Sequence, residues 1–114
     1  MTPQDFFKND LFAERAGIVL MEVREGYSKA RLEIKKEHLN AGNRTQGGAI
    51  FTLADLALAA AANSHGQLAF SLSSNITFLR ASGIGDTLYA EARERYIGRS
   101  TGCLLYTSDA ADDL

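Results

Sequence analysis

A single acid, Asp55, lies in the middle of a long apolar stretch. From Ala49 to Ala62, every residue is apolar except Thr52 and Asp55. Because this pattern leaves no polar face, it predicts a helix that is buried on all sides. Burial of an ionised carboxylate is costly and raises its pKa toward the range of a general base. Asp55 is therefore a candidate general base, although an acid that only accepts hydrogen bonds in a wet or inter-subunit seam fits the same pattern.

Two glycines, Gly47 and Gly48, precede the apolar stretch. The first turn of a helix leaves several backbone N–H groups unpaired at the positive end of the helix dipole. Since glycine has no side chain, a substrate carbonyl could approach these groups closely, as acyl transfer requires. For a Gly-Gly pair taken alone, a loop that turns sharply into the helix is the simpler explanation.

Length and composition set the class of protein that could carry these residues. The 114 residues correspond to one domain, and 46% hydrophobic with 23% charged residues is typical of a globular protein. A net charge of −2 without a basic block argues against nucleic acid or an anionic membrane as partner. One cysteine and two histidines are too few for a disulfide framework or a Cys/His metal site. The polar N-terminus is unlike a signal peptide, so we expect a cytoplasmic protein.

The remaining elements are read from hydrophobic periodicity and turn residues. A membrane span is not expected, because the apolar stretch is short for one and carries an acid. The pattern predicts a short amphipathic helix over 4–15, strands over 17–24, 27–34, 68–79 and 86–96, and a further strand from about residue 102. The last two of those four strands should pair with each other, and 35–46 should be a polar loop. One apolar helix among antiparallel strands predicts an α+β fold whose sheet curls around the helix.

Two segments together resemble a known family. The stretches LNAGNRTQGGAIFTLADLALAAAANSHG and NITFLRASGIGDTLYAEARERYIGRSTG are similar to the hotdog-fold acyl-CoA thioesterases of the PaaI-like type, and the likeness covers roughly residues 11–102. The resemblance implies a homodimer or homotetramer that pairs through its sheets. It also implies an acyl-CoA substrate and no separate cofactor, coenzyme A being part of the substrate. Neither nucleic acid nor a membrane is implied as a partner.

The resemblance implies roles for individual residues. Asp55 corresponds to the carboxylate that activates water or attacks the thioester, Gly47 to the backbone donor to the thioester carbonyl, and Asn40 to an asparagine that orients water or substrate. The site would form across the dimer seam, with Asp55 of one chain facing Gly47 and Asn40 of the other. Further substrate contacts are assigned to Gln46, Gly48, Ser71, Arg80 and Arg99. Taken alone, Asn40 fits a turn and the arginines fit a solvated surface.

Two features depart from the family pattern. The family usually has a histidine before the glycines, where this chain has Gln46, which can hydrogen-bond but cannot titrate near neutral pH. We expect activity to survive this change because the chemistry uses Asp55 and a backbone donor. The final residues, CLLYTSDAADDL, resemble a translated sequencing adapter. We therefore expect a domain over 1–102 and a non-native tail over 103–114, of which 104–106 could still occupy the next strand position.

Other functions fit parts of the sequence. A hydrolase triad of Ser64, His65 and Asp55 is disfavoured, since Ser64 and His65 are neighbours and no nucleophile-elbow motif surrounds them. A hotdog dehydratase would want a histidine where Gln46 stands. The main alternative is a non-catalytic acyl-CoA-binding protein in which Asp55 is only structural. The acyl group itself is left open between aryl and medium-chain groups.

Overall fold

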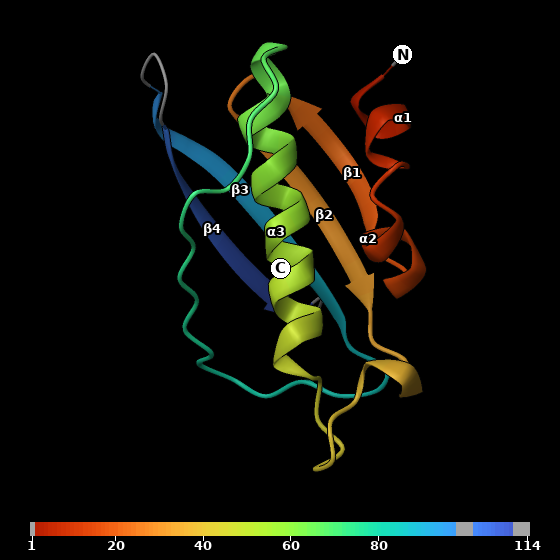
Figure 1. Cartoon of the computed structure of the whole chain (residues 1–114). Coiled ribbons are helices and arrows are strands. Elements are labelled where there is room, and N and C mark those ends of the chain that lie inside the picture. The colour runs from red at the N-terminus through yellow and green to blue at the C-terminus, as the bar shows by residue number, and fades with distance from the viewer. Residues whose placement is uncertain (1, 98–101, 111–114) are drawn as a thin grey trace.

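The fold is an antiparallel sheet with one long helix across its face (Figure 1). The computed structural model describes residues 2–97 and 102–110, and the strand over 102–110 only through its backbone. The strand order in the sheet is β1-β2-β3-β4, and this antiparallel sheet with its single long helix confirms the expected α+β architecture. The elements in chain order are α1 (Pro3–Phe7), α2 (Leu11–Ala16), β1 (Val19–Arg24), β2 (Tyr27–Glu33), the 3₁₀ turn η1 (Lys36–His38), α3 (Gly47–Ala62), the 3₁₀ turn η2 (Asn63–His65), β3 (Thr87–Ile97) and β4 (Gly102–Ala110).

The N-terminal segment forms two short helices, so the single helix predicted over 4–15 is wrong. Asp10 interrupts it, because its carboxylate accepts a 3.1 Å hydrogen bond from the Ala13 N–H and so caps α2. Thr2 and Asp5 form a separate capping box at the start of α1. Helix α2 ends at Ala16 and is capped by Gly17, whose φ of 91° is the left-handed conformation that glycine adopts readily.

The predicted hairpin and its alternation are confirmed. Strands β1 and β2 pair antiparallel, and the inward side chains of β2 include Ser28, Ala30 and Leu32, all fully buried. Strand β3 pairs with β2 so that Ala30 lies opposite Ala90. The small alanines on both strands leave room for the helix to approach the sheet closely.

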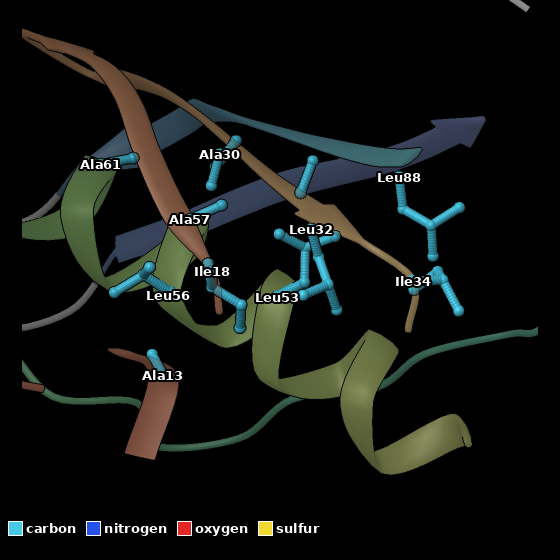
Figure 2. Close-up of a cluster of buried hydrophobic side chains, with 12 residues drawn as sticks. Ala13, Ile18, Ala30, Leu32, Ile34, Leu53, Leu56, Ala57, Ala61 and Leu88 are labelled. Atoms are coloured by element: carbon cyan, nitrogen blue, oxygen red, sulfur yellow. The ribbon is translucent and has the colours of Figure 1, made fainter. Parts of the chain in front are cut away.

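Helix α3 covers the sheet with one face only, so the expectation of a helix buried on all sides is wrong for the single chain. Its buried side chains meet those of β2 and β3 in one core, drawn in Figure 2 and formed largely by Leu32, Leu53, Ala57 and Leu88. The Ser28 hydroxyl donates a 2.5 Å hydrogen bond to the Ala57 carbonyl oxygen and ties this strand to the helix. The opposite face of the helix has no element of the described chain packed over its middle (Figure 1).

A membrane span must still be considered for this helix. The segment Gly47–His65 has 19 residues and enough apolar character to cross a membrane, so the expectation that it is too short is wrong. The core helix of a globular domain passes the same test of length and composition, however. Because the described structure packs α3 against β2 and β3, we interpret it as a core helix.

The predicted strand over 68–79 does not form, and its predicted pairing with 86–96 is wrong. Both edges of β3 are already paired, one with β2 and the other with β4. A strand needs a neighbour for its backbone groups, and no described segment pairs with 68–79. The segment instead runs outside the β4 side of the sheet and returns beneath the start of α3 (Figure 1). It exposes large apolar side chains, among them Phe70 (84%) and Leu72 (91%).

The outer face of the sheet holds one strongly perturbed phenol, Tyr27. Its ring lies between the guanidinium groups of Arg24 and Arg93, 4.1 Å and 4.8 Å from the ring centre. Its hydroxyl donates a 2.5 Å hydrogen bond to the Glu91 carboxylate. Burial, followed by this hydrogen bond and the charge of Glu91, raises the pKa of Tyr27 from 10.0 to about 12.

We expect this phenol to make the fold sensitive to alkali between about pH 10 and pH 12. Because the pKa of Tyr27 is higher in the folded protein, the unfolded chain loses this proton at a lower pH than the folded chain does. The contribution of Tyr27 to the free energy of unfolding is therefore complete below the unfolded pKa and is lost as the pH rises through the folded pKa. Urea unfolding at pH values on both sides of 10 measures the free energy of unfolding. This free energy should fall less between the two pH values in Tyr27→Phe than in the wild type. Tyr96→Phe, at an exposed position, serves as the control and should behave as the wild type. Equal losses in all three proteins would contradict the assignment.

Candidate active site

The start of α3 presents one backbone donor that has no partner among the described residues. Gln46 is the N-cap residue, and its side-chain oxygen accepts a hydrogen bond from the Gly48 N–H. Its carbonyl oxygen accepts from the N–H groups of Ala49 and Ile50. Within the part of the chain that the structure describes, the Gly47 N–H makes no hydrogen bond. Of the two glycines, Gly47 is therefore the one whose N–H is available to a substrate carbonyl.

An aromatic side chain from far along the chain flanks this donor. A Cβ added at Gly47 would come within 3.2 Å of Cζ of Phe78, so only glycine fits here without a shift of the ring. Thr45, just before the helix, holds the returning segment by accepting a 2.7 Å hydrogen bond from the Ser82 hydroxyl and donating its N–H to the Ser82 carbonyl oxygen at 2.8 Å. Phe78 is not among the site residues predicted from the sequence, because no local pattern connects it with Gly47.

The loop before the helix is organised by Asn40. Its side-chain oxygen accepts hydrogen bonds from the N–H groups of Gly42 (2.9 Å) and Arg44 (3.1 Å), and its own N–H donates to the Arg44 carbonyl oxygen. This is the turn-forming use of asparagine. The side-chain NH₂ of Asn40 has no partner among the described residues, so the same side chain can both shape the loop and donate to a ligand.

Asp55 lies on the exposed face of α3, opposite the core. The expectation that Asp55 is buried within the chain is therefore wrong for the chain by itself. Asp55 follows Gly47 by eight residues, which corresponds to about 12 Å along a helix. One thioester carbonyl cannot contact both groups of a single chain at that separation. A site that uses both needs a second chain.

The other predicted contacts are dispersed or lie outside the described residues. Ser71 and Arg80 are exposed in the segment that runs outside the sheet. Arg99 lies outside the described residues. His38 is buried and structural, since its ring accepts a hydrogen bond from the Lys35 N–H at 2.9 Å and lies 2.6 Å from the Ala16 carbonyl oxygen.

The triad of Ser64, His65 and Asp55 is not assembled. The Ser64 hydroxyl donates to the Ala61 carbonyl oxygen at 2.6 Å and accepts from the Gly26 N–H at 2.8 Å. His65 contacts Glu94 at 2.9 Å, at the end of the helix away from Gly47. Its distance from Asp55 along the chain corresponds to about 15 Å of helix.

An antiparallel sheet with one long helix packed across its face is the arrangement of the hotdog fold. The Thioesterase superfamily model matches residues 42–113, so the chain belongs to that superfamily. A putative esterase of Archaeoglobus fulgidus is 46% identical over 87% of this chain and 64% of its own length.

Solved structures agree with this assignment. The acyl-coenzyme A thioesterase PaaI of Escherichia coli is 38% identical over 84% of this chain and 69% of its own length. Its structure matches 95% of this chain and 78% of that chain with a TM-score of 0.91 at 33% identity. A Streptococcus mutans protein solved with acetyl-CoA matches with a TM-score of 0.80 at 28% identity, over 85% of this chain and 78% of its own. The chain spans about two thirds of the length of the curated relatives it matches.

Proposed function

We propose that this protein hydrolyses the thioester of an aryl- or medium-chain acyl-CoA. The observation that carries the proposal is the Gly47 N–H at the start of α3, which has no hydrogen-bond partner among residues 2–97, beside a glycine whose N–H is already capped by Gln46. A single donor of this kind can stabilise the oxyanion that forms on a thioester carbonyl. The PaaI name of one relative and the acetyl-CoA of one solved structure support coenzyme A thioesters as the substrate class.

The chemistry follows from the placement of the acid. Asp55 takes a proton from water, and the oxygen of that water forms a bond to the thioester carbon while the Gly47 N–H stabilises the oxyanion. When the oxyanion collapses, the carbon–sulfur bond breaks and the thiolate of coenzyme A leaves, taking up the proton. The products are a carboxylic acid and free coenzyme A, and no other reactant is consumed. Asn40 orients the water or the substrate in this scheme.

The site is proposed to form between two chains. Asp55 and Gly47 of one chain are too far apart to act on one carbonyl. The exposed Phe70 and Leu72 also leave an apolar segment that a second copy would cover. We place Asp55 of one protomer opposite Gly47 and Asn40 of its partner, in a cytoplasmic dimer or tetramer. Gln46 and Gly48 shape the carbonyl site, and Ser71, Arg80 and Arg99 are proposed contacts for coenzyme A.

The exposure of Asp55 in the single chain favours one alternative. If Asp55 is a solvated acid in the assembled protein as well, the same fold would bind acyl-CoA without hydrolysing it. Coenzyme A thioesters would then bind without release of thiol.

The test is thiol release from a panel of aryl- and fatty-acyl-CoA thioesters. We expect turnover with at least one aryl or medium-chain member, both in this 114-residue chain and in a version whose residues 103–114 are replaced by the corresponding segment of a relative. Turnover that appears only in the second version would place the fault in residues 103–114. Binding without turnover in both versions would establish the acyl-CoA-binding alternative.

A further inference from the structure

The loop between η1 and α3 closes on itself through an antiparallel bridge of Leu39 with Thr45. Beside this bridge, the Gln46 N–H donates a 2.8 Å hydrogen bond to the His38 carbonyl oxygen. Gln46 caps α3 and directly precedes Gly47. Backbone hydrogen bonds of this kind hold the two sides of a loop at a fixed separation. The position of the Gly47 N–H therefore depends on the position of His38.

The ring of His38 is held through both of its nitrogens. Nδ1 accepts a 2.9 Å hydrogen bond from the Lys35 N–H. Because a backbone N–H can only donate, this contact assigns the ring hydrogen to Nε2. Nε2 then donates to the Ala16 carbonyl oxygen, which lies 2.6 Å away. His38 is only 6% exposed, so water has little access to these two hydrogen bonds.

The partner of Nε2 belongs to an element that is itself anchored in the core. Ala16 is the last residue of α2, and the end of a helix leaves its carbonyl oxygens without partners inside the helix. Ala13 of the same helix is 2% exposed and belongs to the core cluster. The His38 side chain therefore joins the loop before α3 to a helix that cannot move without disturbing the core.

We propose that His38 is a positioning residue of the site, and that its Nε2 hydrogen bond to Ala16 holds the Gly47 N–H where it meets the thioester carbonyl. The proposal rests on the proposed thioesterase function. His38 does not touch the substrate and acts through the backbone of Gln46. A displacement of about 1 Å can lower the rate of a catalysed reaction by about 10²-fold. Loss of the anchor should therefore lower activity even where the fold persists, and Asn40, on the same loop, would be displaced as well.

Three substitutions of His38 test which hydrogen bond matters. Alanine removes both, glutamine can keep a donor near the place of Nε2, and asparagine can keep an acceptor near the place of Nδ1. For His38→Ala and His38→Asn we expect kcat for thiol release to fall about tenfold or more, whereas His38→Gln should recover most of this loss. Wild-type kcat in His38→Ala, or recovery by asparagine and not by glutamine, would overturn the proposal.

His65→Ala is the matched control for a loss that comes only from lower stability. His65 is the other histidine of the chain and contacts Glu94 at 2.9 Å, at the end of α3 away from Gly47. Urea unfolding gives the free energy of unfolding of each variant, and kcat is compared at a temperature where all of them are folded. His65→Ala should lose stability and keep its kcat. An equal fall of kcat in both alanine variants would show a general effect of destabilisation and would overturn the positioning role.

Amide hydrogen exchange separates this proposal from the thioesterase function itself. In His38→Ala, the Gln46 and Asn40 amides should exchange faster than in the wild type, while the Ala30 amide, in the centre of the sheet, should keep its protection. His38→Gln should restore the slow exchange. A wild type that hydrolyses no thioester would contradict the proposed function, and faster exchange in His38→Ala would still support the anchor. Unchanged exchange at Gln46 in His38→Ala would overturn the anchor whether or not the protein is active.

Discussion

Asp55→Asn should lower kcat for thioester hydrolysis by about 10²- to 10⁴-fold, the usual contribution of a positioned general base. Asparagine keeps the size and the hydrogen-bonding oxygen of the side chain but cannot take a proton from water. Because Asp55 lies on the exposed face of α3, outside the core, the fold should tolerate the change. Thiol release at saturating phenylacetyl-CoA measures kcat, and urea unfolding checks that the protein is intact.

Asp10→Asn is the matched control for this loss. Asp10 caps α2 through the Ala13 N–H, and asparagine caps a helix about as well as aspartate. The control removes the same charge without touching the proposed site, so kcat should stay within about twofold. If Asp55→Asn keeps wild-type kcat, Asp55 is not the base, and water must be activated by another group.

Gly47→Pro should lower kcat by about 10²- to 10³-fold with little effect on folding. Proline removes the backbone N–H that is proposed to hold the oxyanion, and loss of one such donor costs about this much. Proline is well tolerated at the first position of a helix. The preceding Gln46 already has φ −65° and ψ 133°, the extended conformation that a following proline requires. The measurement is again kcat for thiol release, with circular dichroism to confirm the helix.

Gly47→Ala controls for the side chain that proline also adds. Alanine keeps the N–H but places a Cβ against the ring of Phe78, at 3.2 Å from Cζ. Any loss of kcat in Gly47→Ala comes from crowding against Phe78. The double variant with Gly47→Ala and Phe78→Ala should remove this crowding and recover the lost kcat. The additional loss of kcat in Gly47→Pro relative to Gly47→Ala then measures the effect of removing the N–H. Equal activity of the alanine and proline variants would exclude Gly47 as the oxyanion donor.

The same two variants test whether one site uses two chains. If Asp55 of one protomer acts with Gly47 of its partner, a mixed dimer of Asp55→Asn and Gly47→Pro chains contains one intact site. Refolding the two inactive proteins together should then restore about a quarter of wild-type activity, since half of the dimers are mixed and each has one working site of two. No recovery in a mixture shown to contain mixed dimers would contradict a site that combines Asp55 of one chain with Gly47 of its partner.

Several elements could be predicted because their signals are local. The β1–β2 hairpin follows from a turn at Gly26 and alternating side chains, and the alternation of β3 follows from Leu88, Ala90 and Ala92. The N-terminal helix was predicted as one element because its apolar spacing is continuous. The segment forms two helices, α1 and α2, because the carboxylate of Asp10 caps the start of α2.

The amino-acid sequence by itself determined that 49–62 is helical and that this helix carries an acid near its middle, whereas the structure starts α3 at Gly47, two residues before the apolar stretch. Helix periodicity and capping depend on neighbours a few residues apart, so they can be read from the chain. Only the tertiary structure decided which face of α3 is covered, that 68–79 pairs with none of the described strands, and that Phe78 lies against Gly47. These outcomes depend on competition between distant segments for the same sheet edges and the same helix surface, and that competition leaves no local pattern.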